Sequence, residues 1–194
     1  QFDIYQMATA AKQLGTSDIG KKITATNPLE TAGFSVAITA GAFTVDGTQI
    51  TIATTDTVND VISRITSNVS NVTASYDSGT DKISITKSSG TLVMGSATDT
   101  SNFLQATHLT NNGTAGITST HRLGGINLQH TADAASFQNS GTAASGSFTI
   151  NGVTISYAAT DTIADIISKI NSSSSSVFAS YDAVNDRFKL TNKT

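Results

Sequence analysis

The stretch that decides the fold of this chain of 194 residues is GAFTVDGTQITIATTDTVNDVISRITSNVSNVTASYDSGTDKISITK, residues 41–87. It returns at a constant spacing of 105 residues, without a gap, as GSFTINGVTISYAATDTIADIISKINSSSSSVFASYDAVNDRFKLTN, residues 146–192. About 22 of the 47 aligned pairs are identical. Solenoid repeats are about 20–50 residues long, so a longer period predicts two copies of one folded module.

Each copy carries the same local signals in the same order. Asp46-Gly47 and Asn151-Gly152 separate runs of alternating polarity, which is the typical signal of a β-hairpin. Thr57, followed three residues later by Asp60, resembles a helix capping box with Asp in place of Glu, and the second copy repeats the pair. Each copy therefore predicts a hairpin followed by the start of a helix.

One apolar stripe at helical spacing follows each cap. Its members are Val58, Val61, Ile62 and Ile65 in the first copy, and Ile163, Ile166, Ile167 and Ile170 in the second. Residues 72–76 and 82–86 then alternate as a second hairpin. The predicted fold class is α+β, with two β-rich modules. Each module holds a β-β-α-β-β unit in which one helix packs on an antiparallel, four-stranded sheet.

The segments outside the copies give weaker signals. Gln1–Gln6 and Phe34–Ile38 are typical of strands, Met7–Leu14 favours a helix, and Asp99–Leu109 predicts a short helix. The region Thr110–Ser145 is rich in small polar residues, which favours a domain boundary near residue 115.

The sequence therefore predicts a first domain, residues 1–115, and a second domain, residues 116–194. The region 92–109 that follows the first copy has no counterpart after the second copy. We therefore expect the second domain to be incomplete at its C-terminus.

The composition excludes several classes of protein. Lys and Arg number 11 against 14 Asp and Glu, and charged residues make up 13% of the chain. About 25% is usual, so the surface is neutral and rich in the hydroxyls of about 57 Ser and Thr residues. This balance argues against electrostatic binding of nucleic acid. No apolar stretch has the length of a membrane span, and the absence of Cys excludes disulfides and thiol catalysis.

We find no catalytic, cofactor-binding or metal-binding constellation in the sequence. His108, His121 and His130 lack metal-ligand spacing, and Gly124-Gly125 indicates a turn rather than a phosphate-binding loop. The loops 77–81 and 182–186 each contain two Asp residues. Turn chemistry explains these loops better than Ca²⁺, which needs six to eight oxygen ligands. The chain is predicted to be a binding or structural protein without enzymatic activity or a cofactor.

The second copy resembles the short IN repeat of bacterial flagellins and flagellar hook-associated proteins. The matching features are the Asn151-Gly152 turn, the helix start Thr160-Asp161-Thr162, the helix end Ile167–Asn171 and the turn Ala179–Asp182. Residues 2–14 are similar to a segment of the flagellar filament cap family, also called hook-associated protein 2. Met7 stands where that family usually has Leu. Residues 101–106 with Leu109 resemble the segment after the family's repeat.

This resemblance implies a structural role in the bacterial flagellum. In the cap family, long terminal coiled-coil helices build a homo-oligomer, which sits at the extracellular filament tip and promotes insertion of flagellin. The chain would be the outer part of such a protein, with flagellin and other hook-associated proteins as partners and with no nucleic acid or membrane. Without the terminal helices, residues 1–194 alone are expected to be monomeric.

Two alternatives to a cap protein remain open from the sequence. A flagellin could carry these residues as a variable outer domain of a filament subunit. A secreted adhesin or carbohydrate-binding module would also suit a hydroxyl-rich surface, although such modules usually need exposed aromatic rings, and few aromatic residues lie outside the repeats.

Overall fold

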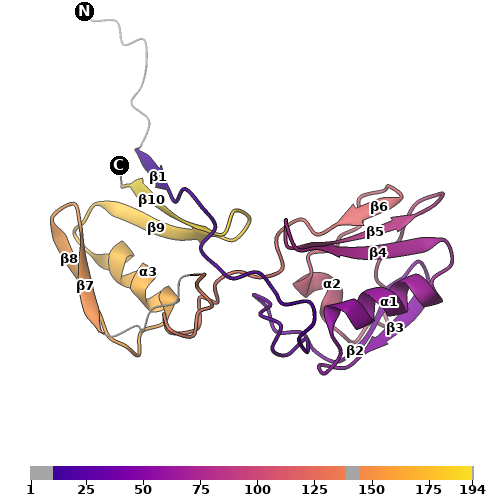
Figure 1. The fold of residues 1–194 in the computed structure, drawn as a ribbon. Helices are drawn as coiled ribbons and strands as arrows, with labels where there is room; N and C mark the ends of the chain where they lie inside the picture. Colours follow the sequence, from indigo (N-terminus) through magenta and orange to yellow (C-terminus); the bar gives the residue numbers. More distant parts are fainter. Residues whose placement is uncertain (1–10, 139–144, 194) are drawn as a thin grey trace, which may run out of the picture. The chain divides into compact units, whose positions relative to one another are not determined.

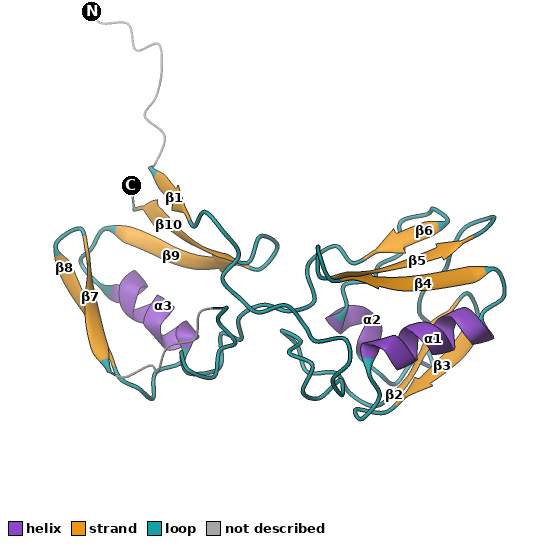
Figure 2. Ribbon diagram, viewed as in Figure 1, coloured by secondary structure: helices purple, strands orange, loops and turns teal. Residues whose placement is uncertain are grey.

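The computed structural model describes residues 11–138 and 145–193. The chain divides into two compact units: residues 20–126 form one, and residues 11–19 together with the described part of 127–193 form the other. We call them the inserted unit and the split unit. Figures 1 and 2 label their helices and strands.

The inserted unit contains the first repeat. Its elements are β2 (Gly41–Val45), β3 (Thr48–Ile52), α1 (Val58–Asn68), β4 (Val72–Asp77), β5 (Lys82–Lys87), α2 (Phe103–Ala106) and β6 (Gly116–Thr118). The split unit contains the second repeat, with β1 (Lys12–Leu14), β7 (Gly146–Ile150), β8 (Val153–Tyr157), α3 (Ile163–Ser172), β9 (Val177–Asp182) and β10 (Arg187–Asn192). The two repeats have the same β-β-α-β-β order, which confirms the predicted α+β class.

The sheets differ from the prediction of one four-stranded sheet for each repeat. The first hairpin of each repeat forms a two-stranded sheet, β2-β3 or β7-β8. The second hairpin belongs to a separate three-stranded antiparallel sheet, β4-β5-β6 in the inserted unit and β1-β10-β9 in the split unit. The helix of each repeat contacts both sheets, α1 through β3 and β4, and α3 through β8 and β9. In each unit a third strand from outside the repeat thus joins the second hairpin, and the first hairpin stays separate.

These pairings with strands from outside the repeats explain why the units differ from the predicted domains 1–115 and 116–194. β6 lies beyond residue 115 but pairs with β5 of the first repeat, with Ile117 opposite Ile85. β1 lies at the start of the chain but pairs with β10 of the second repeat, with Gln13 opposite Leu190. Each unit is closed by a strand that precedes the other repeat in sequence.

Three further expectations concern segments outside the repeats. The short helix expected within Asp99–Leu109 is present as α2. The helix expected over Met7–Leu14 is wrong in its described part, because residues 12–14 are extended as β1. The strand expected at Phe34–Ile38 is reduced to one bridge between Phe34 and Gly124. The expected strand Gln1–Gln6 lies outside the described residues.

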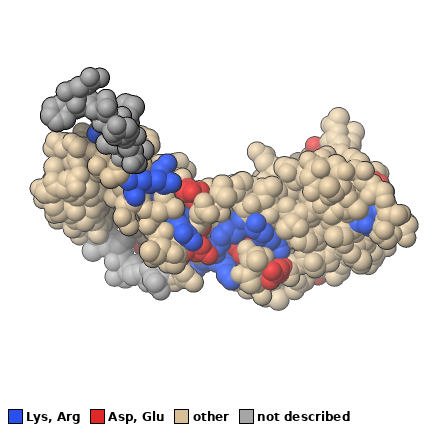
Figure 3. Space-filling view, turned by 90° about the horizontal axis from the view of Figure 1, so that it is seen from above, with Lys and Arg blue, Asp and Glu red and all other residues tan. Residues whose placement is uncertain are grey.

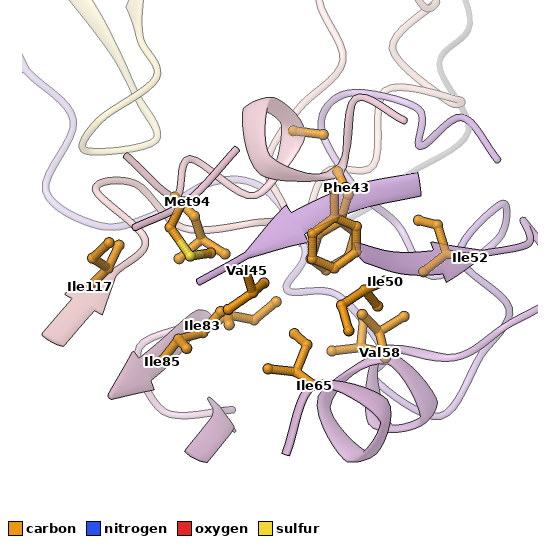
Figure 4. Close-up of a cluster of buried hydrophobic side chains, with 14 of the residues drawn as sticks. Phe43, Val45, Ile50, Ile52, Val58, Ile65, Ile83, Ile85, Met94 and Ile117 are labelled. Carbon is orange, nitrogen blue, oxygen red and sulfur yellow. The ribbon is translucent and has the colours of Figure 1, made fainter. Parts of the chain in front are cut away.

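The core of the inserted unit forms where the two sheets and α1 meet (Figure 4). Val58, Val61 and Ile65 of α1 are fully buried, whereas Ile62 of the predicted stripe is only partly buried at the margin. β-Branched side chains of the strands, including Ile50 and Ile83, complete this core. The alternating pattern of the strands and the helical stripe therefore converge on one apolar interior.

Both helices begin with a complete capping box. The Thr57 hydroxyl accepts from the Asp60 N–H at 3.1 Å, and the Asp60 carboxylate accepts from the Thr57 N–H at 2.9 Å. Thr162 and Asp165 repeat this geometry in α3. In both cases the hydrogen bonds from the threonine lower the pKa of the aspartate. Each cap thus satisfies amide groups that the first helical turn leaves unpaired.

The inserted unit also contains a close backbone crossing between residues 20–21 and 124–125. A Cβ atom at Gly20 would lie 2.5 Å from the Cα of Gly125, and one at Gly124 would lie 2.3 Å from the carbonyl oxygen of Lys21. The two segments can approach this closely only because neither glycine has a side chain.

We predict that Gly124→Ala destabilises the inserted unit by about 1–3 kcal/mol, because the added methyl group forces the crossing segments apart. Gly116→Ala is the matched control, since its Cβ would meet only the Thr86 methyl group at an ordinary 3.5 Å. Urea unfolding of both variants measures the difference. Equal stability of the two variants would contradict the crossing.

We also predict that both units lose stability in acid. The pKa of Asp60 and Asp165 is lower in the folded protein than in the unfolded chain. The unfolded chain therefore binds more protons as the pH falls, and stability that is constant above about pH 5 decreases below about pH 4.

Urea midpoints at pH 6 and pH 3 measure this decrease. The variants Thr57→Ala and Thr162→Ala should each lose about 1 kcal/mol at pH 6. Their midpoints should also depend less on pH than those of the unchanged chain. An unchanged dependence on pH would show that the caps do not contribute.

Candidate functional site

The acidic loops that the sequence offered as weak calcium candidates are occupied by structural contacts. Asp77 accepts hydrogen bonds from the Gly79 N–H at 2.7 Å and the Thr80 hydroxyl at 2.8 Å, which lower its pKa. The Lys22 ammonium donates to the carbonyl oxygens of Ser78 and Gly79 at 2.8 and 2.7 Å. A lysine cation thus already contacts the carbonyl oxygens that a metal ion would need. In the corresponding loop of the second repeat, Asp182 accepts from Asn185 through its backbone and side chain.

The second aspartate of each loop is buried and holds distant segments together. The Asp81 carboxylate accepts from the Tyr76 hydroxyl at 2.7 Å, the Gly124 N–H at 2.9 Å and the Ile23 N–H at 3.3 Å, and Arg122 Nε lies 3.7 Å away. Burial and the hydrogen bond to Asp81 raise the pKa of the Tyr76 hydroxyl. Three donors and a cation satisfy this carboxylate, which makes it a structural anchor.

Asp186 occupies the same position in the second repeat. It is also fully buried, and the Tyr181 hydroxyl donates to it at 2.6 Å. The backbone carbonyl of Asp186 accepts from the Ile19 N–H at 3.1 Å, just as that of Asp81 accepts from the Leu123 N–H at 2.9 Å. The backbone that follows the third strand, β1 in the split unit and β6 in the inserted unit, is therefore held by the equivalent aspartate in both units.

The aspartates that precede the helices pair with a cation about two turns into the same helix. Asp56 contacts Arg64 at 2.8 Å, and Asp161 contacts Lys169. The pKa of Asp56 and of Asp161 is lowered first by this hydrogen bond. These side chains therefore serve the helix starts rather than a proton-transfer reaction.

The three histidines lie in two places. The rings of His108 and His121 meet edge to face, with centroids 4.7 Å apart, and both are partly buried. Burial, followed by the charge of His121, lowers the pKa of His108. His130 is exposed and contacts the Ala134 carbonyl. Within the described residues, no three His, Cys, Asp or Glu side chains come together as a metal-binding group. No local pattern in the sequence indicated that His108 and His121 would meet.

The most distinctive surface feature is an open apolar groove in the split unit, which has a volume of about 480 Å³. It lies between the β7-β8 hairpin, α3 and the β9-β10 strands. Its lining residues are Ala132, Phe137, Phe148, Ile150, Tyr157, Ile163, Ile166, Ile167, Ile170, Ala179, Phe188 and Leu190. Figure 3 shows that most of the described surface on the face in view carries no charged side chain.

Within residues 11–138 and 145–193, no segment equivalent to residues 92–109 of the inserted unit covers this groove. In the inserted unit, Phe103 of α2 stacks on Phe43 of β2 with ring centroids 4.5 Å apart, and Phe43 is fully buried. The residue equivalent to Phe43 is Phe148. Its side chain is only partly buried and remains accessible at the groove. Ile166, equivalent to the fully buried Val61, is also partly exposed.

The groove lies beside a strand edge that carries no outside partner in the described residues. Across residues 11–138 and 145–193, no hydrogen bond from outside the β7-β8 hairpin reaches the backbone of Ser147 or Thr149. An unpaired edge next to apolar surface is a common docking place for an additional polypeptide segment. The groove and the β7 edge are therefore the candidate interaction surface of this chain.

Comparison with known proteins places these features in a family. The family described as "Flagellin hook IN motif" matches residues 141–194. The chain is 33% identical over 156 residues to the "Flagellar hook-associated protein 2" of Thermotoga maritima, which covers 75% of this chain. The chain is thus flagellar hook-associated protein 2-like and carries an IN motif. This confirms the resemblance inferred from the repeats. No solved structure matches the chain.

The IN motif corresponds to the second repeat, and the structure shows that the first repeat has the same element order. The chain spans about a quarter of the length of the Thermotoga relative. None of the helices in the described parts of the chain has the length and apolarity needed to cross a membrane.

We predict that the open groove makes the two repeats respond differently to the same substitution. Phe43→Ala should destabilise the inserted unit by about 3–5 kcal/mol, the usual cost of emptying a buried phenylalanine site. Phe148→Ala should cost the split unit less than half as much, because its side chain buries less area. Calorimetry of the two variants measures both transitions. A larger loss for Phe148→Ala would contradict an open groove.

Proposed function

We propose that this chain is the outer part of a flagellar structural protein that acts as the filament cap. In this proposal it lies outside the cell at the filament tip and promotes polymerisation of flagellin. The single observation that supports it best is the 33% identity to a flagellar hook-associated protein 2 across three quarters of the chain.

The structure suits an assembly role rather than catalysis. Acidic side chains of the described residues are used in turns, caps and buried anchors, as with Asp77, Asp60 and Asp81. In this proposal the partners are flagellin and other hook-associated proteins, and other parts of the protein build a homo-oligomer. Residues 1–194 alone are then monomeric, without enzymatic activity.

The second candidate function is that of a variable outer domain in a flagellin subunit. The match of residues 141–194 to a family described as a flagellin hook IN motif favours it. The two functions differ in copy number and position, because a cap occupies one end of a filament and a flagellin occupies its whole length.

We predict that gold-labelled antibody against residues 20–126 marks only the filament tip in the bacterium that encodes this chain. Electron microscopy of detached filaments measures the position of the label. Label along the whole filament would support the flagellin alternative and overturn the cap. If the antibody labels neither the tip nor the length of the filament, the adhesin alternative from the sequence analysis remains.

A deletion in the same bacterium tests the role in assembly. Removal of residues 20–126, with Ile19 joined to Asn127, keeps every described strand of the split unit, including β1. Shorter filaments and unpolymerised flagellin in the medium are expected. Gly116→Ala serves as the control with an intact inserted unit. Filaments of normal length without leaked flagellin would argue that the inserted unit has no role in capping.

A further inference from the structure

The inserted unit shows how the apolar face of an IN repeat is closed. After β5 ends at Lys87, the chain passes along the outer edge of β2. The Asp46 N–H donates to the Val93 carbonyl at 2.7 Å, and the Gly95 N–H donates to the Thr44 carbonyl at 2.8 Å. The segment that closes the first repeat therefore begins as an additional strand-like partner of β2.

The same segment then supplies a carboxylate and an aromatic ring. The Thr44 hydroxyl donates to Asp99 at 2.6 Å, and the Thr44 N–H donates to the same carboxylate at 3.2 Å. Four residues later, Phe103 stacks on Phe43. Leu92, on the same segment, is fully buried as well. The edge of β2 and the apolar face behind it are thus covered together.

Within the described residues of the split unit, no segment covers the equivalent acceptor surface. Thr149 is equivalent to Thr44, but it is exposed, whereas Thr44 is buried. Asn151 is equivalent to Asp46 and keeps its left-handed backbone, with φ of 48° against 49°. Phe148 keeps the aromatic ring of Phe43. The hydrogen-bonding groups and the stacking surface are therefore present without the segment that would use them.

We propose that the groove and the β7 edge bind a polypeptide segment that follows residue 194 in the full-length protein. This inference does not depend on a cap function. Two observations argue for a segment of the same chain. The first repeat is closed by the residues that directly follow it, and the matched Thermotoga relative is about four times as long as the matching region.

The inserted unit also indicates where this segment lies and what it contains. Val93 and Phe103 follow the end of β5 by 6 and 16 residues (93 − 87 and 103 − 87). The second repeat ends its last strand at Asn192. The segment therefore lies within roughly the first 20 residues after Asn192, by the same count. It contains apolar residues, a carboxylate for Thr149 and an aromatic ring for Phe148.

Amide hydrogen exchange tests this proposal. Residues 1–194 are compared with a chain that is longer by the next 30 or so residues encoded in its own gene, both at concentrations where they are monomeric. In the longer chain, the exchange of the Thr149 and Asn151 amides should slow at least tenfold. Equal exchange in both chains would overturn the proposal. Protection that appears only when the longer chain self-associates would also overturn it, because the occupant would then be a second copy.

Variants of the longer chain separate the groove from the rest of the unit. Ile166→Asp places a charge in the groove and should return the Thr149 amide to fast exchange. Val184→Asp is the matched control, because Val184 is 55% exposed and does not line the groove. Equal protection in both variants would contradict docking in the groove. Exchange at the β9-β10 pairing reports whether each variant is folded, and the comparison of the two unmodified chains needs no variant.

Discussion

The buried carboxylate of Asp81 is the interaction on which the inserted unit depends. It lies at the tip of the β4-β5 hairpin with a left-handed backbone, φ of 57°, and collects donors from Tyr76, Ile23 and Gly124. These residues are up to about 100 positions apart in sequence, so the anchor closes a long loop with polar contacts. Without those donors, a buried charge would be costly, and the fold therefore requires all of them in place. The glycine crossing follows from this requirement, because Gly124 must bring its N–H to the carboxylate.

The sequence predicted the elements whose causes are local. The Asp46-Gly47 turn, the Thr57 cap and the stripe that includes Ile65 act over a few residues, and the structure has a hairpin and a helix at these places. It could not predict that residues 12–14 are extended. Their own sequence is compatible with a helix, and only the distant partner β10 makes them a strand. The separate sheets were missed for the same reason, because the pairing of β5 with β6 and of β10 with β1 joins segments far apart in sequence and has no local signal.

The candidate groove was only partly predictable. The repeat pattern placed Phe148 and Ile166 at the positions of Phe43 and Val61, but it did not indicate that they would line an open surface. Two modules with nearly the same sequence pattern thus differ in how completely they bury their apolar side chains. The inserted unit covers Phe43 with its own chain, and the split unit leaves the equivalent ring accessible. One folding pattern serves in the first case as a closed core and in the second as a surface with room for a partner.

The antiparallel pairing of β1 with β10 has a mechanical consequence. Lys12 lies opposite Thr191, so a pulling force applied to the chain on both outer sides of this pair acts at one end of the ladder. Such a force separates the strands one residue pair at a time, as a zip opens, rather than shearing all pairs together. While the β1-β10 ladder holds, tension passes from one strand to the other and bypasses residues 20–126. An unfolding experiment with an atomic force microscope would therefore record a low-force opening of the ladder before any extension of the inserted unit.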